Sequence, residues 1–305
     1  MTDYTTGTGS GGVMLIRDTG TTVEFHIISG YSSTYVYDTD WGGTVNGVSV
    51  SGPLDYPSGG AWKFLASWVV TTSQTVTFSI GDTGTGGLGG PTSFSASITR
   101  ATVPLKPTSP GVSGFLLDRM TFAWTRGGNG GSAYIRDEYQ YALNSSFTVG
   151  ASAVLNGTSP KTPTGLTART KYYWRARSVN AVGNGPWSTT VSGDTLDYPD
   201  KPPIPALVSK TSTAITVALT DPTYVGAGVT ARESQISTSS TFATITSTDS
   251  SSGPYWHAPT HPITRNTQYY IRFRVQNSIG YSAWSDTLAV KTDAEVPSAP
   301  TGYGV

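Results

Sequence analysis

Two segments in the second half of the chain alternate strictly between apolar and polar positions. In residues 172–177 the apolar series is Tyr172, Trp174 and Ala176, with arginines at 175 and 177. Residues 269–276 repeat this pattern, with arginines at 272 and 274. A period of two predicts β-strands that bury one face, and we expect the other face to carry the guanidinium groups into water.

These segments belong to a longer internal repeat with an offset of 97 residues. Leu166, Thr170 and Tyr172 recur at this offset as Ile263, Thr267 and Tyr269. The same offset relates six further pairs: Arg175 and Arg272, Arg177 and Arg274, Asn180 and Asn277, Gly183 and Gly280, Trp187 and Trp284, Ser188 and Ser285. Nine matches within about 25 residues predict two copies of one domain.

Proline pairs mark the domain boundaries. The pattern Pro-x-x-Pro stands at 104–107, 199–202 and 297–300. Proline lacks a backbone donor and interrupts a sheet, so each pair marks the entrance to a domain. The predicted domains are therefore 104–198 and 199–296, followed by a C-terminal tail, 297–305, for which disorder and docking on a neighbour both stay open. Closely spaced turns without helical periodicity favour antiparallel sandwiches.

The first hundred residues do not share the repeat but also predict strands. A turn at 18–21 separates the apolar segments 13–16 and 23–28, and Asn46-Gly47 is a strong hairpin signal. Further strands are predicted at 62–70, 75–80 and 93–98. Glycine-rich residues 1–12 are interpreted as a flexible arm, and 13–103 as a further sandwich. The predicted fold class is all-β, with three tandem antiparallel β-sandwiches.

Residues 104–198 and 199–296 each resemble a fibronectin type III module. The stretch from Tyr172 to Trp187 is similar to the final two strands of that family and the turn between them. Leu166 and Tyr172 resemble its tyrosine corner, in which the phenol hydroxyl binds the backbone of the preceding connection. The corresponding structural residues of the second copy are Ile263, Tyr269 and Trp284. The resemblance implies a fold more than a function, because such modules serve both as spacers and as binding surfaces.

Composition excludes several function classes. The chain has 19 basic and 19 acidic residues, so it lacks the basic surface expected of a nucleic-acid binder. It has no cysteine, which rules out disulfides, thiolate catalysis and cysteine-bound metals. We find no apolar stretch long enough for a membrane helix, and no signal peptide at the N-terminus.

Three motifs that point to chemistry have simpler interpretations. Gly81–Gly90 looks like a phosphate loop, but a strand rather than a helix is predicted to follow it. His257 and His261 have zinc spacing on a helix, yet Pro259 lies between them, so we interpret them as surface loop histidines. Gly127–Gly131 is expected to be a mobile loop.

Asp38, Asp40 and Asp55 do not make a convincing calcium site or glycosidase pair. We predict a non-enzymatic protein with no cofactor and no bound metal.

Aromatic residues are abundant in the first domain. Seven tyrosines and tryptophans fall within residues 31–68, more than one core of this size needs. About half are expected to be core residues, because aromatic rings bury large areas. Trp41 and Tyr56 are predicted to lie in turns, and together with Trp62 they are the candidate surface contacts, since exposed rings stack on sugars and anchor protein interfaces.

The domain order resembles the minor tail proteins of siphophages that infect actinobacteria. The residues that carry this resemblance are 73–80, the loop 81–92 and residues 93–99, followed by the two appended modules. It implies a virion protein of the tail or tail tip, released by host lysis. The implied partners are other tail proteins, further copies of the chain in a homo-oligomer, and host-envelope glycans. The competing hypothesis is a bacterial surface or secreted glycan-binding module, accessory to a polysaccharide-degrading enzyme.

Overall fold

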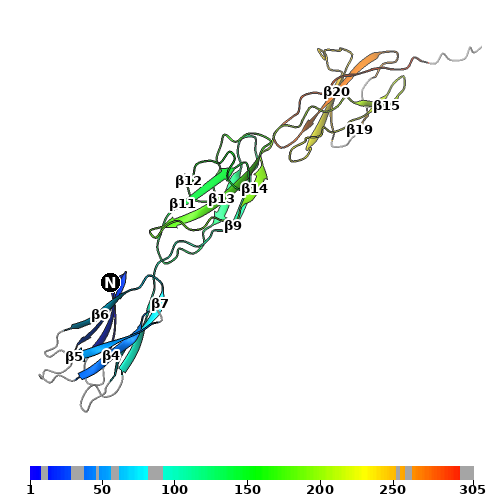
Figure 1. Ribbon diagram of the computed structural model, residues 1–305. Coiled ribbons are helices and arrows are strands. Elements are labelled where there is room, and N and C mark those ends of the chain that lie inside the picture. The colour runs from blue at the N-terminus through cyan, green and yellow to red at the C-terminus, as the bar shows by residue number, and fades with distance from the viewer. Residues whose placement is uncertain are drawn as a thin grey trace, which may run out of the picture. The chain divides into compact units, whose positions relative to one another are not determined.

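The computed structural model describes residues 1–7, 13–28, 38–45, 48–55, 62–81, 92–251, 255–257 and 263–295. The described residues form strands, turns and irregular segments, without an α-helix, and all strand pairing between named strands is antiparallel (Figure 1). No helix of these residues is long and apolar enough to cross a membrane. The chain forms two compact units: residues 1–103 with 129–133 and 181–183, and the remainder from Pro104 onward.

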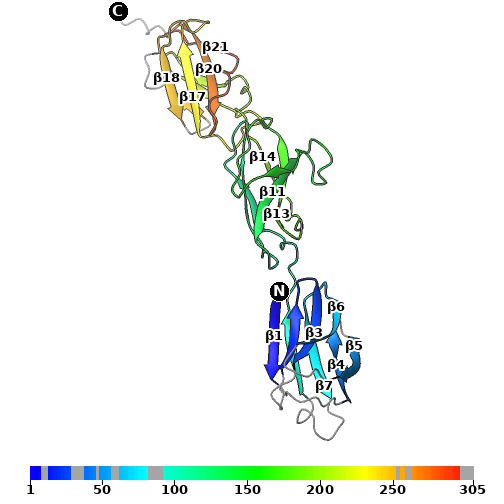
Figure 2. The same cartoon turned by 90° about the vertical axis from the view of Figure 1, so that its left-hand side faces the viewer.

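The first sandwich has two four-stranded sheets. One sheet has the order β1-β2-β3-β6 and the other β5-β4-β7-β8, and Figure 2 shows them on either side of a common interior. Their bounds are β1 Thr2–Gly7, β2 Val13–Asp18, β3 Thr22–Ile28, β4 Asp38–Val45, β5 Val48–Asp55, β6 Lys63–Val69, β7 Gln74–Gly81 and β8 Thr92–Ile98. The strands predicted from residue 13 onward are therefore confirmed, and Val45 pairs with Val48 across the predicted Asn46-Gly47 turn.

Aromatic stacking holds these two sheets together. Phe25 of β3 and Phe78 of β7 are fully buried, and their ring centroids are 4.5 Å apart. Gly43 of β4 lies against Phe25, and a Cβ there would collide with the carbonyl oxygen of Thr77. Glycine is thus required because the Thr77 carbonyl and the Phe25 ring together occupy the space that a side chain would need. At the sandwich edge, Arg100 donates from Nη1 to Asp18 at 2.7 Å and from Nε to the carbonyl of Val70 at 2.7 Å.

The flexible-arm prediction for residues 1–12 is wrong for its first part. Thr2–Gly7 forms β1 and pairs along its full length with β2, from Thr2 opposite Asp18 to Gly7 opposite Val13. Thr2, Thr5 and Thr6 give no apolar alternation, and this edge strand is held by backbone pairing with β2 and by Tyr4, which packs against the core. Residues 8–12 lie outside the described residues.

The middle module, residues 104–198, also contains two sheets. Its strands are β9 Thr108–Ser113, β10 Thr121–Thr125, β11 Tyr134–Ala142, β12 Leu155–Asn156, β13 Lys171–Asn180 and β14 Val191–Asp194. One sheet pairs β9 with β10, to which Lys161 adds a single bridge at Phe122, and the other has the order β12-β11-β13-β14. This strand order is that of a fibronectin type III module, as the sequence resemblance predicted.

The last module, residues 199–296, repeats this arrangement. Its strands are β15 Ala206–Lys210, β16 Ile215–Ala218, β17 Ala231–Ser237, β18 Ser247–Ser251, β19 Tyr255–His257, β20 Gln268–Gln276 and β21 Leu288–Lys291. The sheets have the orders β15-β16-β19 and β18-β17-β20-β21. The chain is thus all-β, with three tandem antiparallel sandwiches of which the last two are fibronectin type III-like.

Both tyrosine corners form as predicted. Tyr172 accepts a hydrogen bond from the backbone N–H of Thr167 at 3.0 Å, and Tyr269 accepts one from Thr264 at 2.7 Å. Leu166 and Ile263, one residue before these donors, are each 6% exposed and complete the corners within the cores. The hydroxyl satisfies a backbone donor five residues earlier, so each corner holds the connection before β13 or β20 to the strand itself.

The glycine-rich segment Gly127–Gly131 is tied to its surroundings, in contrast to the predicted mobile loop. The carbonyl of Gly128 accepts a hydrogen bond from Leu105 N at 2.8 Å, and the carbonyl of Gly130 accepts one from Thr102 N at 2.7 Å. The hydroxyl of Tyr134 donates to the carbonyl of Gly127. A Cβ at Gly127 would approach the carbonyl oxygen of Leu105 to 2.6 Å, so glycine here permits close backbone contact rather than motion.

Candidate functional surfaces

The arginines of β13 do not extend into water as predicted but lie against aromatic rings. Arg175 stacks between Phe147 and Trp187, with its guanidinium carbon 3.9 Å and 4.4 Å from the two ring centroids. Arg177 lies on the same Trp187 ring at 4.4 Å. We call this series the middle ladder. The rings cover both the apolar stem and the charged end of these arginines, so the outer face of the sheet is packed side chains rather than free charges in water.

The last module has an equivalent series, the last ladder. Arg272 lies 4.0 Å from the centroid of Phe242 and 4.4 Å from that of Trp284. Arg274 lies 4.5 Å from Trp284 and, in addition, 3.9 Å from Tyr281. Phe147 and Phe242 both have positive φ, 57° and 56°, which turns each ring from its loop toward the strand. The two ladders are therefore one repeated construction, and Trp187 and Trp284 are its central residues.

Hydrogen bonds complete both ladders. Gln140 accepts from Nε and Nη2 of Arg175 at 3.1 and 2.6 Å, and Gln235 accepts from the same atoms of Arg272 at 3.1 and 2.8 Å. Burial lowers the pKa of the Arg175 guanidinium, and the neighbouring Arg177 charge lowers it further. Arg272 has a lowered pKa for the same two reasons, burial first. Both groups stay charged at neutral pH because arginine starts from so high a value.

Two buried acids of β11 anchor the middle module. Asp137 is 2% exposed and accepts from Arg126 Nε, at 3.0 and 2.9 Å, and from the Ser178 hydroxyl at 2.8 Å. Glu138, 4% exposed, accepts from Arg177 at 2.7 Å and from Arg136 at 2.7 Å. Burial alone would raise the pKa of Glu138, but the hydrogen bonds from the two arginines outweigh it and lower that pKa overall. Glu138 thus connects the middle ladder to the sheet interior.

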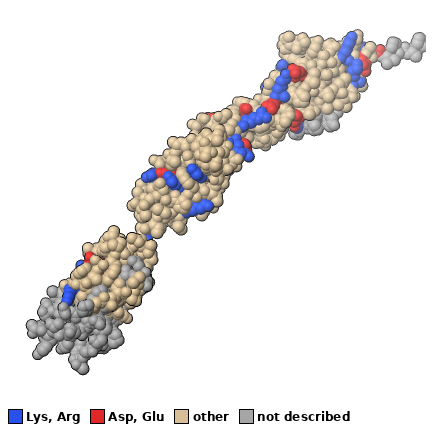
Figure 3. Space-filling view, viewed as in Figure 1, with Lys and Arg blue, Asp and Glu red and all other residues tan. Residues whose placement is uncertain are grey.

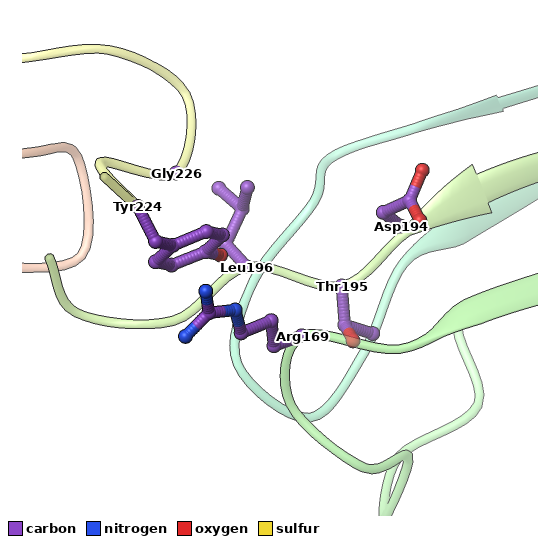
Figure 4. A pocket seen from close by; sticks show the side chains of 6 residues that line it. All are labelled: Arg169, Asp194, Thr195, Leu196, Tyr224 and Gly226. Carbon is purple, nitrogen blue, oxygen red and sulfur yellow. The ribbon is translucent and has the colours of Figure 1, made fainter. Parts of the chain in front are cut away.

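A small cavity lies where the middle and last modules meet (Figure 4). It has a volume of about 180 Å³ and is lined by Arg169, Asp194, Thr195, Leu196, Tyr224 and Gly226. The Arg169 side chain lies over the Tyr224 ring, 3.8 Å from its centroid, and its Nη1 donates to Asp200 at 3.1 Å. The Thr195 hydroxyl is used within the middle module, where it donates to the Thr167 carbonyl at 2.6 Å. The polar side chains of Arg169 and Thr195 are thus already bound to other groups of the protein.

The three candidate contacts of the first sandwich have different outcomes. Trp62 is 44% exposed and precedes β6, whose Phe64 is 52% exposed. Trp41 lies within β4, paired with Gly52 and Ile80, so the predicted turn at this residue is wrong. Tyr56 lies outside the described residues. Trp62 is therefore the candidate with a described exposed side chain, and its role as a contact stays a prediction.

The weaker motifs can be placed in part. Thr92–Ile98 forms β8, which confirms that a strand follows the glycine-rich segment after residue 81. His257 lies in β19 opposite Thr216, so its assignment to a loop is wrong, while His261 lies outside the described residues. Asp38 and Asp55 pair across β4 and β5. Among the residues that the structure describes, no group of three or more His, Asp or Glu side chains is arranged to hold a metal ion.

Charge is distributed in small mixed groups. On the face in Figure 3, most of the described surface is neither basic nor acidic, and in the two modules basic and acidic atoms lie next to each other. Exposed pairs such as Lys201 with Asp286, at 2.6 Å, account for part of this pattern. The described surface on that face therefore has no continuous patch of one sign of the kind that steers a polyanion.

Comparisons with known proteins identify no family. No family model and no curated protein matches the chain. Among solved structures, the crystal structure of the chicken CNTN1 FN1-FN3 domains aligns over 96% of this chain and 100% of that chain, with 16% sequence identity and a TM-score of 0.34. At this score the alignment adds nothing to the assignment of fold, which rests on the strand order of the two modules and their tyrosine corners.

Proposed function

We propose that the chain is a non-enzymatic structural and adhesive component of a bacteriophage tail or tail tip. In this proposal the first sandwich mediates assembly, and the two fibronectin type III-like modules act as spacers or host-surface contacts. The observation that carries the spacer role is the tied linker: the loops of each module hydrogen-bond the chain that enters it, through Leu105 and Gly128 in the middle module and Asp200 and Tyr224 in the last. A spacer needs its linkers held in this way if it is to keep the parts at its two ends a fixed distance apart.

The ladders support the same role. Stacked guanidinium groups and buried acids stabilise the outer sheet of each module without leaving an apolar face that requires a partner. The arginines are occupied by rings, by Gln140 and Gln235, and by Glu138 and Glu233. Their hydrogen-bonding groups are used within the module, which suits a structural role better than a ligand-binding one. No catalytic step is assigned to any of these residues.

The first sandwich offers surfaces for assembly with other tail proteins or with further copies of the chain. Trp62 and Phe64 expose aromatic area at one end of β6, and aromatic residues contribute strongly to protein interfaces. In this proposal the protein is carried in the virion and reaches the exterior when the host lyses, which requires no signal peptide.

Labelling of purified particles tests the virion assignment. Antibodies raised against the full chain should bind the tails of particles from the source and should appear at one position along the tail by immunogold microscopy. Particles lacking capsid but retaining tails serve as the control for location. If mass spectrometry of purified particles finds tail proteins but not this chain, the assignment is wrong.

A second candidate function is favoured by the exposed pair Trp62 and Phe64. Two neighbouring exposed rings are typical of surfaces that stack on sugar rings, so the chain is alternatively a glycan-binding module of a surface or secreted protein. Under this alternative, Trp62→Ala should abolish retention of the full chain on purified cell-envelope polysaccharide. Leu105→Ala, which removes a side chain that is 62% exposed elsewhere, is the matched control and should leave retention unchanged.

A further inference from the structure

The chain between the middle and last modules is held by a buried asparagine. Asn277 is 2% exposed, and its Nδ2 donates to the carbonyls of Asp197 at 2.7 Å and Val225 at 3.2 Å. Its Oδ1 accepts from the backbone N–H groups of Ile279 at 2.8 Å and Gly280 at 3.1 Å. One side chain thus joins the linker to two loops of the last module. All of its strong hydrogen-bonding capacity is used in doing so.

Two glycines allow the linker to approach this closely. Gly226 has φ +66°, and a Cβ there would lie 2.7 Å from Nδ2 of Asn277. Gly280 has φ +154°, and its Cβ would lie 2.8 Å from the ring of Tyr198. Both positions combine an unusual backbone conformation with a lack of space, so a side chain at either would displace the linker.

Arg169 holds the same linker from the opposite module. Its guanidinium group binds the Asp200 carboxylate at 3.1 Å and lies flat on Tyr224, 3.8 Å from the ring centroid. Asp200 N in turn donates to the carbonyl of Tyr224 at 3.0 Å. Arg169 itself has a positive φ of 53°, which turns its side chain out of the connection that precedes β13. The last module therefore holds the linker at Asp197 and the middle module holds it at Asp200, three residues further on.

We propose that this arrangement is a rigid joint, in which Asn277 clamps the linker and Arg169 braces it, so that residues 104–296 move as one body. Tandem domains in general move relative to one another unless their interface prevents it. Here a fully bonded buried side chain, a cation on an aromatic ring and an ion pair act on a linker of a few residues. The joint gives the proposed spacer role its mechanical basis and rests on that role only for its biological meaning.

Pulsed electron–electron double resonance, which measures the distance between two spin labels, tests the joint on the full chain. Because the chain has no cysteine, the double substitution Ser145→Cys and Ser240→Cys places one spin label on an exposed residue of each module. A reference variant with about six Gly and Ser residues inserted between Leu196, which hydrogen-bonds the middle module, and Asp197, which Asn277 binds, reports the distance distribution of a flexible linker. The parent should give a single distribution that is narrower than that of the reference by about twofold or more.

Substitutions then separate the clamp from the brace. Arg169→Gln should broaden the distribution, and Asn277→Ala should broaden it further. The matched control is Arg265→Gln, which removes an ion pair with Glu295 that lies wholly within the last module, and it should leave the distribution unchanged. Circular dichroism verifies folding. If Asn277→Ala does not fold, Arg169→Gln alone decides the outcome.

Two results would overturn the joint. A parent distribution as broad as that of the reference would show that the modules move independently. A narrow parent distribution that neither Arg169→Gln nor a folded Asn277→Ala changes would show that these residues do not hold the linker. Neither result depends on whether the chain is found in virions, so the failure of the joint and the failure of the proposed function are distinguishable.

Discussion

The middle and last modules place equivalent strands around two chemically different cores. The middle core is aromatic: Phe122, Trp124 and Trp174 lie in ring contact, with centroid separations of 5.0 Å and 5.6 Å from Phe122 to the two indoles. The last core is mainly aliphatic, with Tyr269 and Phe273 as its buried aromatic residues. Ile271 stands where the middle module has Trp174, 97 residues earlier. Both side chains are fully buried.

What the two modules retain lies mainly in their strand connections and on the outer face of one sheet. The tyrosine corners, the ladders and the loops that grip the entering linker recur in both, although the buried side chains differ in size and shape. A sandwich tolerates core exchange when total volume and the alternation of buried positions are kept. The comparison teaches that connections and strand faces define this module more strictly than its interior does.

The largest expected effect is a core truncation in each module. Trp174→Ala should destabilise the middle module by about 4 kcal/mol and Ile271→Ala the last by about 3 kcal/mol, because the cavity left by an indole is larger. Hydrogen exchange of the full chain, read separately on β13 and β20, measures both. Among the described residues Nε1 of Trp174 has no acceptor, so Trp174→Phe, the control, should cost much less. Equal exchange in parent and Trp174→Ala would contradict the assignment of this core.

The second effect concerns the buried Glu138. Glu138→Gln leaves Arg177 and Arg136 without their carboxylate and should cost the middle module about 2 kcal/mol. The folded-state pKa of Glu138 lies below its ordinary value of 4.5, so its contribution is complete above that pH and is lost as the pH falls through the lower folded value. Chemical denaturation between pH 6 and about pH 3 should therefore show the difference between parent and variant shrinking with acid. A difference independent of pH would contradict this account.

The third effect distinguishes the two ladders. Trp187→Ala removes the ring that Arg177 uses and should cost about 1–2 kcal/mol. The cost of Trp284→Ala should be smaller than that of Trp187→Ala by about 0.5–1 kcal/mol, because Arg274 keeps its contact with Tyr281. Denaturant unfolding curves of the two variants, compared with the parent, give the values. The prediction fails if Trp284→Ala is the more costly substitution.

The smallest effect is a gain. Asn184 is the position in the middle module equivalent to Tyr281, and each forms a single bridge to the preceding strand, Asn184 to Val179 and Tyr281 to Gln276. Asn184→Tyr should place a second ring on Arg177 and stabilise the middle module by about 0.5–1 kcal/mol. In the Trp187→Ala background the gain should be larger. The corresponding Tyr281→Asn variant should lose a similar amount, and thermal unfolding measures all three.

Sequence reasoning was most successful where the signal was local or repeated. The tyrosine corners followed from Leu166 and Tyr172 because hydroxyl and backbone donor are five residues apart. The hairpin at 18–21 followed from a turn between apolar runs, and Gly20 there has a φ of 98°. The offset of 97 residues predicted two equivalent domains because their shared positions are fixed by strand connections rather than by core identity.

Features that depend on residues distant in sequence were missed. Arg175 and Phe147 are 28 residues apart, and their contact depends on a positive φ at Phe147 that no pattern in the sequence indicates. The recurrence of arginines with Trp187 and Trp284 was the available signal, yet it did not specify stacking. β1 was missed because threonine-rich residues at a sheet edge show no apolar alternation, and Tyr4 alone of these residues packs against the core.

The gripped linkers also define what can be transplanted. Cutting the chain at Pro104 or Pro199 would leave Val103 and Tyr198 behind, although both side chains lie against glycines of the module that follows, Gly183 and Gly280. A module excised together with the few residues before its proline pair keeps both the linker side chain and the glycine that this side chain contacts. Grafting or natural recombination that respects this boundary would transfer the module together with the contacts that hold its linker. A cut at the prolines would transfer the folded module without those contacts.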